Sequence, residues 1–126
     1  MPVEFRFTVS AGPKAPGIAR HELARRTAPY LDDGPHDDAI LALSEIVTNV
    51  VRHGGVGDGA PITIGVEPVP GRVRIIVEQP TAMPSVTAGY EPTVDGGIGL
   101  AIVEKVAAGW GIDNGPPGRV WFDVSP

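Results

Sequence analysis

Residue types that carry several common functions are missing from this chain. It has no cysteine among its 126 residues, which excludes disulfide frameworks, cysteine zinc sites and thiol catalysis. It has no basic block and a net charge of −5, which argues against direct binding to DNA or RNA. Its three histidines, His21, His36 and His53, are isolated from one another, so a metal cage built from protein ligands is not expected.

Long hydrophobic runs are missing as well. No stretch of 18 apolar residues could span a membrane, and the N-terminal MPVEFRFTVS carries charges within an alternating pattern, unlike a signal peptide. Hydrophobic residues still make up 42% of the chain and charged residues 20%, which is typical of a folded globular protein. We therefore expect a soluble, cytoplasmic protein with a single domain over residues 1–126.

Hydrophobic periodicity predicts the element order β-α-α-β-β-loop-α-β-β. Alternation predicts strands near residues 5–9, 62–66, 73–77, 110–112 and 120–124. Helical spacing predicts helices over about 18–29, 35–53 and 97–108. Residues 79–97 have no period, and a loop of that length in a small domain is usually functional or mobile. The order favours an α+β fold, a two-layer α/β sandwich with about three helices on one face of a mostly antiparallel mixed sheet.

The helix predicted over residues 35–53 has a polar side opposite its apolar stripe. Glu45 and Asn49 are one turn apart on that side, so their side chains point to the same place. A carboxylate beside an amide can polarise a water molecule and offer a neutral oxygen ligand to Mg²⁺. The alternative is a solvated polar face, which this helix alone favours.

A glycine-rich segment, Asp95 to Leu100 (DGGIGL), opens the third predicted helix. Glycines let the backbone approach an oxyanion closely, and free N–H groups at a helix start favour phosphate. The segment is not a Walker loop, because no Gly-Lys-Ser/Thr follows, and it is not a convincing dinucleotide fingerprint. The alternative is a loop that needs flexible residues and a helix cap.

Together these segments resemble a known family. Leu43 to Gly54 (LSEIVTNVVRHG) is similar to the N-box of the GHKL ATPases, the group of gyrase, histidine kinases and MutL, and Gly96 to Val103 (GGIGLAIV) resembles their G2 box. The chain length, the N-terminal strand and the ending GRVWFDV resemble small stand-alone members, the anti-sigma factors and serine-protein kinases of the RsbW and SpoIIAB type. The resemblance covers almost the whole chain and implies the Bergerat ATP-binding fold.

The resemblance implies roles for the matching residues. Glu45 matches the general base that activates an acceptor serine, and Asn49 matches the residue that holds Mg²⁺ against the ATP phosphates. Residues 79–95 match the lid over the nucleotide, and Arg20 looks like an arginine that contacts protein partners. The other residues expected at the nucleotide are His53, Glu78, Gly96, Gly97, Ile98, Gly99 and Leu100.

The sequence departs from the family at the G1 box. That box is usually Asp-x-Gly-x-Gly, and its aspartate accepts a hydrogen bond from the adenine amino group. Here the strand ends Val77 to Ala82 (VEQPTA), so Glu78 keeps a carboxylate one methylene further out and both glycines are gone. Pro80 also fixes its own φ. Either Glu78 still reaches adenine, or it is an exposed strand end and nucleotide binding is weak or lost.

The resemblance implies a regulator that binds ATP and Mg²⁺. Such a protein sequesters a sigma factor, or acts as a serine kinase on an anti-anti-sigma partner of the STAS type, and family analogy suggests a homodimer. Two alternatives stay open. One is a non-catalytic docking module with a degenerate nucleotide site, and the other is an ATPase or kinase domain of another signalling complex.

Overall fold

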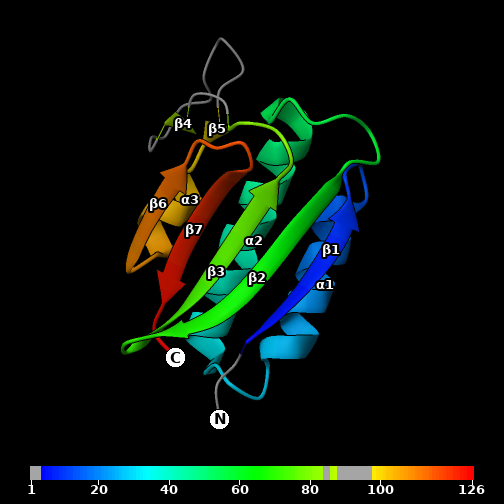
Figure 1. The fold of residues 1–126 in the computed structure, drawn as a ribbon. Helices are drawn as coiled ribbons and strands as arrows, with labels where there is room; N and C mark the ends of the chain where they lie inside the picture. Colours follow the sequence, from blue (N-terminus) through cyan, green and yellow to red (C-terminus); the bar gives the residue numbers. More distant parts are fainter. Residues whose placement is uncertain (1–3, 84–85, 88–97) are drawn as a thin grey trace.

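The computed structural model describes residues 4–83, 86–87 and 98–126 and has two layers (Figure 1). One layer is a five-stranded sheet in which all neighbouring strands are antiparallel, in the order β1-β2-β3-β7-β6. These strands are β1 (Phe5–Ser10), β2 (Pro61–Val69), β3 (Arg72–Gln79), β6 (Gly109–Asp113) and β7 (Gly118–Val124). The other layer consists of α1 (Ala15–Thr27), α2 (Asp33–His53) and α3 (Ala101–Val106), all on one face of the sheet. The α+β sandwich predicted from the sequence is confirmed.

The third helix starts later than the sequence pattern predicts. Two short strands, β4 (Val86–Thr87) and β5 (Ile98–Gly99), form a separate parallel pair, and α3 follows β5. Because Ile98 and Gly99 pair with β4, the extended backbone continues through Gly99 and the helix begins at Ala101. The prediction that the glycines open the helix and that it runs to Ala108 is therefore wrong. Gly96 and Gly97 lie outside the described residues.

The first two helices lie close to their predicted positions. The α1 helix begins at Ala15, three residues before the predicted start, because Pro16 falls in the first turn, where its missing N–H breaks no helical bond. It ends at Thr27, just before Pro29, as the proline predicts. In the described ranges, no helix combines the length and apolar character needed to cross a bilayer.

The core lies between α2 and the sheet. The apolar stripe of α2 is fully buried at Leu43, Ile46, Val47 and Val50. It meets the inward residues of the strands, which alternate with outward residues because successive side chains of a strand point to opposite faces. The inward residues with no exposed surface are Ile62, Ile64, Ile75, Val77, Val120 and Phe122. Each such burial stabilises the fold by about 1.5–3 kcal/mol, so α2 and the three central strands fold as one unit.

The other face of the sheet has no helix over it in the described part of the chain, and we call it the open face (Figure 1). Antiparallel sheets often leave one face to solvent. Arg74 on this face donates hydrogen bonds of 2.8 and 3.1 Å to Asp123, and its guanidinium lies 4.0 Å from the ring centroid of Trp121. The bond to Asp123 raises the pKa of Arg74 above its ordinary value. This ion pair ties β3 to β7.

Two leucines on α2 test this assignment of the core. Leu43 is fully buried, whereas Leu41, two residues earlier, is 53% exposed. Leu43→Ala should lower the free energy of unfolding by about 2–5 kcal/mol, because it removes buried methyl groups and leaves a cavity. Leu41→Ala should change it by no more than about 0.5 kcal/mol. Urea titration of both variants measures the difference, and equal losses would contradict the packing of α2.

Candidate functional site

Glu45 connects the polar side of α2 to the start of α3. Its carboxylate accepts hydrogen bonds from the backbone N–H of Ile102 at 3.0 and 3.1 Å and from that of Val103 at 3.1 Å. The residues it joins are 57 and 58 positions away in the chain. The contact therefore brings the N-box segment against the end of the G2-box segment.

This contact supplies α3 with its N-terminal cap. The first N–H groups of a helix have no partner inside that helix, and Leu100, at the N-cap position of α3, makes no side-chain capping bond. A carboxylate at a helix N-terminus also interacts favourably with the helix dipole. The Glu45 side chain thus does for α3 what a local capping residue normally does, and it holds α3 against α2.

The other described residues of the predicted site lie on α2 and on the segment that leads into α3. Asn49 follows one turn later on the same side of α2 and is half-buried. His53 is exposed and is the last residue of α2. Ile98 and Gly99 form β5, and Leu100 is fully buried directly before α3. The described residues contain no group of three or more histidine and acidic side chains that could hold a metal ion.

Glu78 does not join these residues. In β3 its neighbours Val77 and Gln79 are buried on the helix side, so Glu78 points to the open face. There it accepts a hydrogen bond of 2.7 Å from Arg119 Nε. Because the helices cover the opposite face, its carboxylate does not enter the space between the sheet and α2. The geometry therefore does not support the expected adenine contact by Glu78.

The residue that faces the helices at the end of β3 is Gln79, and it is fully buried. Its Nε2 lies 2.9 Å from the carbonyl oxygens of Gly54 and Ala82 and 3.0 Å from Thr81 Oγ1. The Thr81 carbonyl oxygen is a fourth acceptor at 3.3 Å, and because an amide has two N–H hydrogens, the four acceptors share two donors. Our sequence reasoning overlooked Gln79. The alternation of Val73, Ile75 and Val77 contained the signal, because the next inward position is residue 79.

The Val50 backbone and Gln79 explain why the segment that resembles the N-box ends in glycine. A Cβ at Gly54 would lie 2.5 Å from the Val50 carbonyl oxygen and 2.7 Å from Gln79 Oε1, distances that real side chains do not show. Only a residue without a side chain fits there. Gln79 Oε1 itself has no hydrogen-bond partner in the described structure. The amide thus packs the end of α2 against the residues that follow β3.

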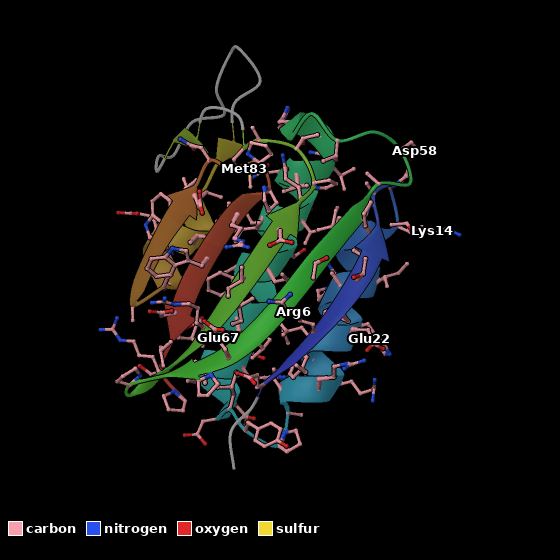
Figure 2. All side chains as sticks on the ribbon, viewed as in Figure 1. Arg6, Lys14, Glu22, Asp58, Glu67 and Met83 are labelled. Carbon is pink, nitrogen blue, oxygen red and sulfur yellow. The ribbon has the colours of Figure 1, made fainter. Side chains whose placement is uncertain are left out.

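The first residues after β3 are held in place by further backbone bonds. The Met83 N–H donates to the Asn114 carbonyl at 2.7 Å, and the Gly118 N–H donates to the Thr81 carbonyl at 2.9 Å (Met83 is labelled in Figure 2). Together with the hydrogen bonds of Gln79, these bonds fix residues 80–83 against β7 and the turn before it.

Arg20 lies apart from this site, between α1 and α2. Its Nη1 donates a hydrogen bond of 3.1 Å to Ser44 Oγ, and its side chain is exposed. Leu41 is one turn before Ser44 on α2 and is 53% exposed. The two helices therefore present a cation and an apolar side chain close together on the surface.

The comparison with solved structures supports the fold. The chain matches the crystal structure of the RsbU and RsbW domains of Rv1364c from Mycobacterium tuberculosis with a TM-score of 0.74 and 23% sequence identity. The match covers 98% of this chain and 33% of that chain, so this chain spans about a third of the length of the protein it matches. The resemblance to the RsbW type is confirmed for the fold. No family model and no curated protein matches the chain.

The capping role of Glu45 predicts a local change in hydrogen exchange. Glu45→Ala should speed exchange at the amides of Ile102 and Val103 about tenfold or more, because a hydrogen bond to a charged group contributes about 1.5–3 kcal/mol. Glu45→Gln keeps an acceptor oxygen and should speed it less. Glu22→Ala, on the surface of α1, is the control and should leave the exchange rates of both amides unchanged. Equal exchange rates of the Ile102 and Val103 amides in all variants would contradict the capping role of Glu45.

Proposed function

We propose that this chain is an ATP- and Mg²⁺-binding regulator of the RsbW type. It acts as an anti-sigma factor and as a serine kinase on an anti-anti-sigma partner of the STAS type, in the cytoplasm. The observation that carries the proposal is the contact of Glu45 with the first turn of α3. That contact assembles the two sequence segments that resemble the N-box and the G2 box on a fold shared with an RsbW-containing structure.

The nucleotide would lie between α2 and the segment that leads into α3. The backbone of residues 96–99 would receive the phosphates, since glycine allows close approach, and Asn49 would offer its amide oxygen to Mg²⁺. When bound, Mg²⁺ neutralises the phosphate charge. At the adenine end, the buried residue that faces the helices is the amide Gln79 instead of a carboxylate, and its donors are already used. We therefore expect adenine to be held more weakly than in a site with the full G1 box.

Glu45 would act as the general base in phosphoryl transfer. The acceptor serine Oγ attacks the γ-phosphorus in line, the bond from that phosphorus to the β–γ bridging oxygen breaks, and ADP leaves. The serine proton passes to a Glu45 carboxylate oxygen. An ionised carboxylate has about four lone-pair sites, and the bonds to Ile102 and Val103 leave capacity for this proton. The same bonds hold the carboxylate in one orientation.

The partner would dock on the surface formed by α1 and α2. Arg20 is held by Ser44 with its guanidinium exposed, and Leu41 lies nearby on the same side of α2. Arginine is among the residues that contribute most to protein interfaces.

A second candidate function is a docking module that has lost its nucleotide. The placement of Glu78 favours it, because its carboxylate is paired with Arg119 on the open face instead of facing the helices. Such a module would bind its partner through α1 and α2 without any phosphoryl transfer.

Thermal unfolding with and without Mg-ATP separates the two candidates. A ligand present at about 100 times its dissociation constant stabilises the folded state by about 2.7 kcal/mol, so the unfolding midpoint should rise by several degrees. Asn49→Ala should reduce the rise produced by Mg-ATP, and Glu22→Ala, whose side chain pairs with Arg25 and Arg26 of α1, should keep it. No rise at millimolar nucleotide would favour the docking module.

Phosphoryl transfer tests the role of Glu45. Glu45→Gln keeps an acceptor for the α3 amides but is not a base, so transfer to the partner serine should fall about 10²–10⁴-fold, the usual contribution of general-base catalysis. Partner binding in a pull-down should stay intact, and Glu22→Gln should transfer phosphate at the normal rate. Normal transfer by Glu45→Gln, with the same partner and nucleotide, would show that Glu45 is not the base.

A further inference from the structure

A cavity of about 670 Å³ lies where the end of β1, the start of α1 and the last turns of α2 meet. Its wall residues fall within 11–16, 48–52 and 56–58, and none of them belongs to the candidate nucleotide site. Pro16 is one turn before Arg20 on α1, and Thr48 is one turn after Ser44 on α2. The cavity therefore lies beyond the Arg20–Ser44 contact along these two helices. Its volume is within the range of sites that hold small molecules.

The walls of this cavity are held in place by backbone hydrogen bonds. The Ala11 N–H donates to the Ala60 carbonyl at 2.8 Å, and the Gly59 N–H donates to the Ala11 carbonyl at 2.8 Å. The Ala60 N–H donates to the Gly57 carbonyl at 3.0 Å, which closes the loop before β2. The cavity is thus formed in the structure without a ligand, and a ligand that enters a pre-formed site loses less free energy to ordering.

Two opposite charges line the cavity, and neither is paired within the described part of the chain. Arg52 lies in the last turn of α2, and Asp58 lies in the loop before β2. Neither forms a hydrogen bond or an ion pair with another described residue. A Cβ at Gly12 would lie 3.4 Å from Asp58 Oδ1, so this carboxylate reaches the turn after β1. Figure 2 labels Asp58 and Lys14 at this end of the molecule.

The rest of the wall is largely apolar. Val51 and Val56 are half-buried and Ala11 is buried, and all three line the cavity. Gly57 in the wall has no packing reason to be glycine, because a Cβ there would meet nothing within 4 Å and its φ is not in the left-handed region. Glycine is common where the backbone comes close to a ligand.

We propose that this cavity binds a short peptide with free termini and apolar side chains. The Arg52 guanidinium would hold the terminal carboxylate, since its planar fork matches a carboxylate. The Asp58 carboxylate would hold the terminal ammonium, and the valine side chains would contact the apolar side chains of the peptide. A single amino acid carries the same two charges but is too small to fill a cavity of about 670 Å³. The proposal does not depend on the nucleotide site.

Isothermal titration calorimetry of the intact chain, without nucleotide, tests the proposal with the dipeptide valyl-leucine and the tripeptide valyl-valyl-leucine. At least one of them should bind with a dissociation constant of about 1 mM or below. Free valine should bind about tenfold more weakly or worse, because it leaves most of the apolar wall uncovered. Absence of binding by both peptides at about 10 mM would overturn the proposal.

Blocking one terminus at a time assigns each charge to its partner. N-acetylation removes the ammonium and should weaken binding to the wild type about tenfold or more, whereas it should hardly matter for Asp58→Asn. Amidation of the other terminus removes the carboxylate and should weaken binding to the wild type by a similar factor, but not to Arg52→Gln. Blocked peptides that bind the wild type as tightly as the free peptide would contradict recognition of the termini.

Matched variants outside the cavity show whether the effects are local. Arg25→Gln on α1 and Asp37→Asn at the opposite end of α2 remove the same charges and should bind the free peptide like the wild type. Thermal unfolding without peptide should give the wild-type midpoint for Arg52→Gln and Asp58→Asn, because both residues are exposed. Wild-type affinity of both cavity variants for the free peptide would place the peptide elsewhere and overturn the proposal.

Discussion

The hydrogen bonds between Glu45 and the first turn of α3 are the contact on which the candidate site depends. Helix α3 has only six residues, so it is too short to be stable by itself and lacks a cap of its own. It stays in place because Val103 and the preceding Leu100 are fully buried and because α2, whose opposite side is fixed in the core, supplies the capping carboxylate. Helix α2 thus packs on the sheet with one side and positions α3 with the other.

The sequence predicted the elements that have strong hydrophobic periodicity. The stripe of α2, the β2–β3 hairpin and the last strand are found close to their predicted positions, because each buries one regular face. The start of α3 was predicted too early. Its boundary depends on the pairing of β4 with β5, a tertiary contact that no local pattern in the sequence contains.

The candidate site was predictable only in part. The spacing of Glu45 and Asn49 placed them on one side of a helix, but the cap on α3 joins residues 57 positions apart and could not be seen in the sequence. At the end of β3, the resemblance to the G1 box suggested Glu78, whereas strand alternation places Gln79 on the side of the helices. The alternation was the better guide, because the direction of a side chain decides what it can reach.

The five strands of the main sheet carry four arginines and four carboxylates, so the whole net charge of −5 belongs to the rest of the molecule, which includes the helix side. The nucleoside triphosphate expected at the proposed site is itself strongly negative. At low ionic strength, long-range repulsion would slow its arrival, and added salt would shorten the range of that repulsion to about 8 Å under physiological conditions. The divalent cation that travels with the nucleotide would have the same effect locally. The distribution of charge over the two faces thus makes the rate at which nucleotide enters the proposed site depend on the ionic composition of its surroundings.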